Sequence, residues 1–145
     1  MTHFVTGLLV VQFLLGAYHF SFAVGVSRPE SIARATRLPS GTVFSHLAMA
    51  VTGAILWLGY EGSHAKGVAW AAFGAFAVGA ALGIFMMLRT VGKPMTLPET
   101  QGPEAEAANL VVAEKQIPPI SIALHFTIGI VLVVVSALVA AGVFS

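Results

Sequence analysis

The chain has 145 residues, of which 57% are hydrophobic and 9% are charged, and its formal net charge at pH 7 is +1. Soluble proteins carry roughly 25% charged residues, so this composition indicates a membrane protein. The small net charge argues against nucleic acid as a partner. The lack of cysteine excludes disulfides, thiolate metal sites, iron–sulfur clusters and covalently attached haem.

Four apolar segments are each about as long as the ~20 residues needed to cross a hydrocarbon core. The predicted fold is therefore all-α: an integral membrane four-helix bundle with up-down topology, forming a single transmembrane domain over residues 1–145. The opening "MTHF" has no positive charge, which favours a first span over a signal peptide. The spans are expected at residues 4–26, 43–60, 68–88 and 120–144.

The two long loops, residues 27–42 and 89–119, hold six of the seven Lys and Arg residues. The positive-inside rule places both loops in the cytoplasm and both termini outside. The expected location of the protein is the cell inner (plasma) membrane. The short connection "EGSHAKG" predicts a tight hairpin of spans two and three. In the last loop, residues 104–116 favour a short interfacial helix, and Pro118-Pro119 suits the start of the fourth span.

Three of the five histidines are expected at one depth. His46 lies about four residues into the second span, His125 about six residues into the fourth, and His19 about seven residues from the end of the first. At 1.5 Å per residue, all three fall within roughly 6 to 10 Å of the cytoplasmic boundary. Ionisable residues inside a membrane are costly and are functional candidates by default.

Each of these histidines shares a helix face with a glycine: His46 with Gly53, His125 with Gly129. His19 shares its face with Gly16 and with Gln12, the only amide of the spans. Glycine permits the close approach of a flat ligand such as a porphyrin, although small residues also simply pack membrane helices together. The third span carries a Gly-x-x-x-Gly pair, Gly79 and Gly83, with no histidine expected near it, so packing alone accounts for that pair.

In an up-down bundle, spans two and four lie diagonally across the core. Diagonal helices are roughly 14 Å apart when neighbours are at 8 to 10 Å, a gap that suits a haem b ligated by His46 and His125. Arg34 and Arg37 then stand where haem propionates reach the cytoplasmic surface, or else serve topology and lipid phosphate. His19 is a hydrogen-bond partner beside the site or an alternative ligand. The other interpretations are a quinone or metal site lined by histidine, and a structural layer without a ligand.

His3 and His64 are expected on the outer side, as solvated groups or as a second site. The spans contain no Asp or Glu, which argues against a proton or cation carrier.

The segments "HLAMAVTGAILWLGY", "VAWAAFGAFAVGAALGIFMMLR" and "LHFTIGIVLVVVSALVAAG" carry a resemblance. Over about two thirds of the chain, the pattern resembles a family of small, largely uncharacterised four-span membrane proteins of actinobacteria. More loosely, histidines on parallel spans are similar to those of four-helix b-type cytochromes. The chain departs from the two-haem members in having one histidine layer, and from some dehydrogenase anchors in having Leu47 after His46 where they pair His with Arg.

The sequence thus favours an electron-transfer subunit over a complete enzyme, with one bis-histidine haem near the cytoplasmic leaflet. Its redox partner would be quinone or a partner membrane subunit, and a homo-oligomer is an open alternative. The competing function is a non-redox accessory or structural subunit of a larger membrane complex.

Overall fold

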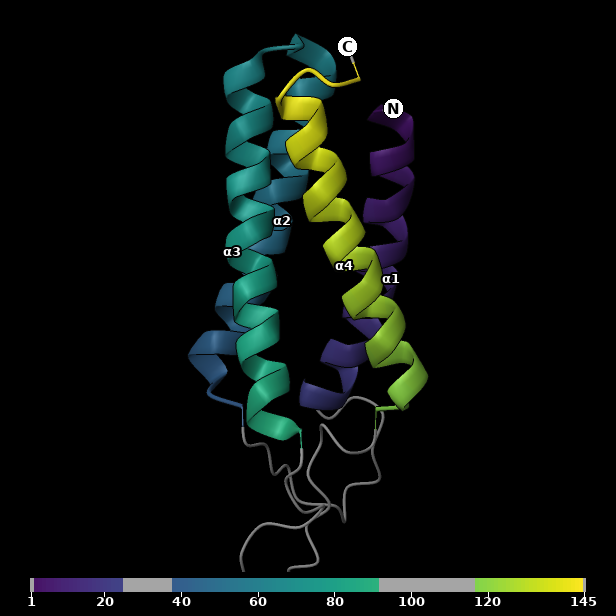
Figure 1. The fold of residues 1–145 in the computed structure, drawn as a ribbon. Helices are drawn as coiled ribbons and strands as arrows, with labels where there is room; N and C mark the ends of the chain where they lie inside the picture. The colour runs from purple at the N-terminus through teal and green to yellow at the C-terminus, as the bar shows by residue number, and fades with distance from the viewer. Residues whose placement is uncertain (1, 25–37, 92–116, 145) are drawn as a thin grey trace, which may run out of the picture.

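A computed structural model describes residues 2–24, 38–91 and 117–144 of the chain. These residues form four α-helices in an antiparallel arrangement (Figure 1). Each helix is long and apolar enough to cross a membrane. Helices suit such segments because every backbone N–H and C=O in the interior finds its partner within the helix itself. The helices are α1 (Thr2–Val24), α2 (Ser40–Ser63), α3 (Lys66–Thr90) and α4 (Pro119–Ala140).

The helices form a four-cornered bundle. α3 packs against α2 on one side and α4 on the other, α4 packs against α1, and α1 meets α2 only sparsely. α2 and α4 therefore lie on opposite corners, as the up-down topology predicts. Both termini and the α2–α3 connection lie at one end of the bundle, the termini end, and the other helix ends lie at the loop end (Figure 1). The termini half and the loop half of the bundle are named accordingly.

Local backbone signals set the helix ends. α4 begins at Pro119, whose fixed φ suits a first turn, as the sequence predicts. The tight hairpin is confirmed as well: α2 ends at Ser63, the left-handed φ of 53° at His64 turns the chain, and α3 starts at Lys66. Glu61, expected beyond the second span, lies inside α2 and accepts a 2.7 Å hydrogen bond from the Thr6 hydroxyl.

α4 ends earlier than predicted, at Ala140 rather than at residue 144. Gly142 adopts a left-handed φ of +80°, its N–H donates to the carbonyl of Val139, and the N–H of Val143 donates to that of Leu138. This pair of bonds is a Schellman cap, which stops a helix even where the sequence remains apolar. Arg34, Arg37, most of both long loops and the helix predicted over residues 104–116 lie outside the described residues.

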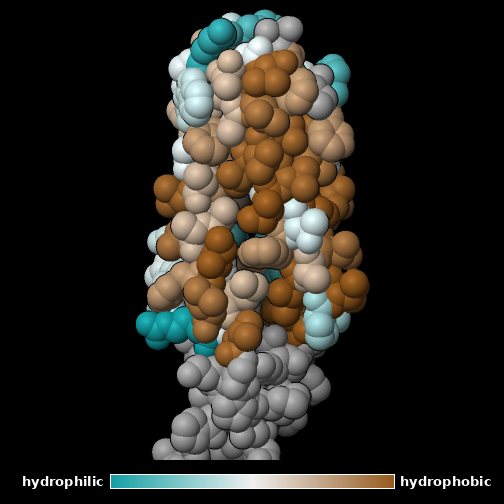
Figure 2. All heavy atoms as spheres, viewed as in Figure 1, coloured by the Kyte–Doolittle hydropathy of each residue, from teal (hydrophilic) through white to brown (hydrophobic). Residues whose placement is uncertain are grey.

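The outer surface of the bundle is largely apolar (Figure 2). Leu14, Ile55 and Leu88 are each more than half exposed. Apolar exposure on this scale suits lipid and not water.

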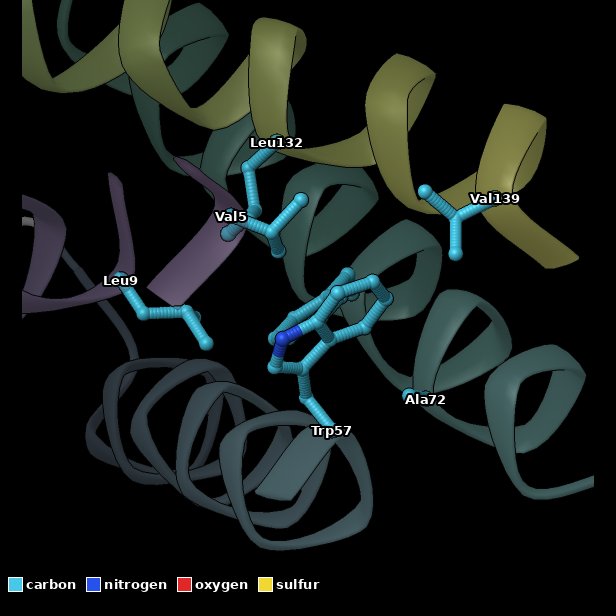
Figure 3. Close-up of a cluster of buried hydrophobic side chains, with 7 residues drawn as sticks. Val5, Leu9, Trp57, Ala72, Leu132 and Val139 are labelled. Atoms are coloured by element: carbon cyan, nitrogen blue, oxygen red, sulfur yellow. The ribbon is translucent and has the colours of Figure 1, made fainter. Parts of the chain in front are cut away.

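The packed core lies in the termini half, around Trp57 of α2, which is completely buried. Side chains from all four helices surround the indole (Figure 3). Alanines on the inner face of α3 allow this close approach of the helices, because a methyl side chain occupies little space between two backbones. The cluster consists of Val5, Leu9, Trp57, Ala72, Phe76, Leu132 and Val139.

Candidate functional site

The loop half encloses a cavity instead of a filled core. This histidine cavity measures about 400 Å³ and lies among all four helices, and its lining is mostly apolar. Figure 2 shows a hollow in the loop half between α3 and α4, with hydrophilic atoms visible inside it. Five polar side chains line the cavity: Gln12, His19, His46, His125 and Thr90, whose hydroxyl donates to backbone carbonyls of its own helix. A cavity of this size and character is typical of small-molecule sites.

His46 lies in the second turn of α2 and reaches across to α3. Its Nδ1–H donates to the carbonyl oxygen of Gly79 at 2.8 Å. Because a carbonyl only accepts, this bond fixes the neutral ring as the tautomer whose Nε2 carries a free lone pair. Gly83 lies beside the same ring, where an added Cβ would come within 3.2 Å of Cε1.

The expectation that Gly79 and Gly83 have no histidine near them is therefore wrong. His46 lies against this pair, because α2 and α3 form the hairpin and their loop-end turns face each other at the same depth. The two glycines leave room for the imidazole to lie against the backbone of α3. The available signal was a count of residues from the loop end of each helix, since Gly83 and His46 lie at similar distances from that end.

His125 of α4 lies against α1. The amide nitrogen of Gln12 donates to its Nε2 at 3.3 Å, which places the proton of the neutral ring on Nδ1. Gly16 stands one turn further along α1, where an added Cβ would be 3.6 Å from Cε1 of His125. Gly129 of α4 gives space to the Gln12 amide in turn. α1 thus holds the His125 imidazole through one hydrogen bond and one glycine.

His19 completes the set from the next turns of α1. Its Nε2 is 3.1 Å from the hydroxyl of Ser121, and that hydroxyl donates its own proton to the carbonyl of Pro118 at 2.8 Å. The Ser121 oxygen therefore accepts from His19, so His19 carries its proton on Nε2. Ser121 was not singled out from the sequence, although it precedes His125 by one helical turn.

The three rings gather at one level of the bundle. The ring centres of His19 and His125 are 5.0 Å apart, and those of His46 and His125 are 6.1 Å apart with their planes inclined by 62°. The predicted common depth of the three histidines is confirmed. Within the described segments of the chain, no set of three or more His, Cys, Asp or Glu residues has the arrangement to hold a metal ion.

Two polar atoms of this site are buried and have no hydrogen-bond partner among the described residues. They are Oε1 of Gln12 and Nδ1 of His125. A buried unpaired polar atom costs about 1–3 kcal/mol, so the Gln12–His125 pair is only half satisfied by the protein.

The remaining predicted residues lie elsewhere. Gly129 lines the cavity, but Gly53 is not among its lining residues. Gly53 is buried beneath Phe76, whose ring would overlap an added Cβ, so its glycine serves the packing of α2 on α3. His64 caps α2, with its ring 6.2 Å from that of Tyr60, and it belongs to no metal-binding group of the described residues.

No protein-family model, curated protein or solved structure matches the chain.

Proposed function

We propose that the chain is an electron-transfer subunit of the plasma membrane that holds one b-type haem between His46 and His125. In this proposal the four helices span the bilayer, the loop end faces the cytoplasm and both termini lie outside. The redox partner is quinone or a partner membrane subunit, and Arg34 and Arg37 meet the propionates.

The observation that supports this function best is the meeting of two imidazoles from opposite corners of the bundle. Their ring centres are 6.1 Å apart. Two imidazoles that share one metal ion, each with a bond of about 2 Å, have ring centres roughly 6 Å apart. The cavity beside them is apolar and of cofactor size.

The two histidines differ in whether the Nε2 lone pair is available to a metal. The bond to Gly79 leaves Nε2 of His46 unprotonated, and a backbone carbonyl on the other ring nitrogen is the usual way to orient a ligating imidazole. Nε2 of His125 is bonded to Gln12, so ligation requires His125 to exchange that weak 3.3 Å contact for the metal. His46 and His125 would hold the haem, which would supply one-electron transfer at this site.

An absorption spectrum of the purified protein tests the proposal. We expect sharp reduced α and Soret bands that disappear in the His46→Ala, His125→Ala double variant. The Thr127→Val variant is a matched control, because Thr127 is exposed on the outside of α4 two residues from His125. A colourless, folded protein from cells grown with ample haem would overturn the haem assignment.

One observation favours the alternative, a non-redox accessory subunit. Each of the three histidines hydrogen-bonds to a neighbouring helix. His46 of α2 bonds to α3, His19 of α1 bonds to α4, and His125 of α4 bonds to α1. Polar bonds of this kind hold membrane helices together without any ligand. In that case the protein is colourless, and loss of the histidines changes only its stability.

A further inference from the structure

We infer that the histidine cavity is a binding site for the head group of a quinone or quinol, with the side-chain amide of Gln12 as its main hydrogen-bonding partner. The inference concerns the same site as the proposed function and rests on that function only for an electron-transfer role, because a head group and a haem would occupy the same space and are therefore alternative occupants. Binding itself needs no haem, so it can be measured separately.

The shape of the cavity suits a lipid-soluble ring. Its lining is mostly apolar, and it lies in the loop half, which the proposed topology sets in the cytoplasmic leaflet of the bilayer. The hollow between α3 and α4 opens on the side of the bundle (Figure 2). A ligand that arrives through the hydrocarbon can therefore insert its head group and leave its tail in lipid. A cavity of about 400 Å³ has only to hold the ring.

Gln12 supplies the chemistry that distinguishes a quinone from a hydrocarbon. It is the only Gln or Asn among the described helices, and it lines the cavity. Its amide both donates and accepts, so it can bond to the carbonyl oxygen of the oxidised ring and to the hydroxyl of the reduced ring. A single side chain can thus serve both redox states.

The half-satisfied pair of Gln12 and His125 supplies the independent evidence for a polar ligand. Oε1 of Gln12 and Nδ1 of His125 are buried without partners among the described residues, although the two side chains touch each other. A carbonyl oxygen of the oxidised ring can accept from the Nδ1–H of His125, and a hydroxyl of the reduced ring can donate to Oε1 of Gln12, whereas an apolar ligand leaves the cost unchanged. Gly129 leaves space for the Gln12 amide, because an added Cβ there would come within 3.2 Å of the amide nitrogen.

The two tryptophans of the chain provide the readout. Trp57 packs with Leu9, Phe76 and Leu132, which also line the cavity, whereas Trp70 is half exposed on the outside of α3. A Trp70→Phe variant therefore leaves Trp57 as the only tryptophan, next to the cavity. Quinone bound there quenches its fluorescence.

The experiment titrates this variant in lipid nanodiscs with a short-chain ubiquinone and a short-chain menaquinone, and the absorption spectrum of each sample records its haem content. We expect saturable quenching by at least one of the two. Adding Gln12→Leu should raise the Kd on the order of fivefold, the effect of one lost hydrogen bond. Gly129→Val, which crowds the amide, should also raise it, and Thr127→Val should not.

The inference is overturned if quenching rises linearly with quinone, which is partitioning into lipid, or if Gln12→Leu and Gly129→Val both leave the Kd unchanged. Saturable binding that depends on Gln12 in a colourless protein supports the quinone site and rejects the haem. A haem spectrum without saturable quenching supports the haem and rejects the quinone site.

Discussion

The two halves of the bundle use the same four helices in different ways. In the termini half, Trp57 is fully buried among aliphatic side chains and alanines, and the helices close on it. In the loop half, the corresponding space is a cavity with three histidines and one glutamine. Small residues have opposite effects in the two places: Ala72 brings helices together around a large ring, whereas Gly83 and Gly16 make room for imidazoles.

This difference separates stability from binding. The termini half has a buried cluster with side chains from α1, α2, α3 and α4, so it can support a loop half that is not filled. The loop half also carries two of the buried polar atoms without a described partner, on Gln12 and His125. Sites that bind ligands commonly keep groups that cost stability in the free protein. Substitutions in the two halves should therefore change different properties.

The largest effect is expected for Trp57→Ala in the termini half. Removal of a fully buried indole leaves a cavity that the helices cannot close, and such changes cost on the order of 3–5 kcal/mol. Thermal unfolding in detergent should show a large decrease in Tm. Trp70→Ala is the control, because Trp70 is half exposed, and it should change Tm little. Equal losses in the two variants would mean that Trp57 is not the centre of the core.

An intermediate effect is expected for Gly53→Ala, where the two halves meet. The added methyl group would overlap the ring of Phe76, so the ring or the helices must shift, at a cost of roughly 1–3 kcal/mol. Gly74→Ala on α3 is the matched control. An added Cβ at Gly74 meets no atom within 4 Å, and the better helix propensity of alanine should stabilise the protein by about 0.5–1 kcal/mol. The Tm of each variant gives the comparison, and a stable Gly53→Ala protein would contradict the close packing of α2 on α3.

The smallest net effect is expected for the double variant Gln12→Leu, His125→Leu. His125→Leu alone leaves the Gln12 amide buried without a partner and should cost about 1–3 kcal/mol. The double variant removes both polar partners and both unpaired atoms, so its stability should lie within about 1 kcal/mol of the parent. A double-mutant cycle of unfolding free energies measures this coupling. Additive losses would show that the two side chains do not act as a pair.

Hydropathy predicted the four helices because each apolar run is long, and depth counting predicted the common level of His19, His46 and His125. Hydropathy could not predict the end of α4, since Val143 and Phe144 are as apolar as the helix before them. The relevant signal was Gly142, a residue that favours the left-handed cap.

The site residues were harder to predict because a helix face does not specify height. Gly53 is two turns, about 10 Å, further along α2 than His46. At that height Phe76 covers Gly53, although Gly53 and His46 share a face of α2. The neighbours of each histidine also depended on which helices touch. The contacts of His125 with Gln12 and Gly16 follow from the packing of α4 on α1, which no single span reveals.

The sparse contact between α1 and α2 has a consequence for biosynthesis. During translation α1 leaves the ribosome first, but the helix it packs against is α4, the last of the four to emerge. The α2–α3 hairpin can form in between, and it already joins His46 to Gly79. Gln12 and His19 meet His125 and Ser121 only after the fourth helix has inserted beside the first. A nascent chain stopped after α3 therefore lacks the α4 wall of the histidine cavity, and with it His125 and Ser121.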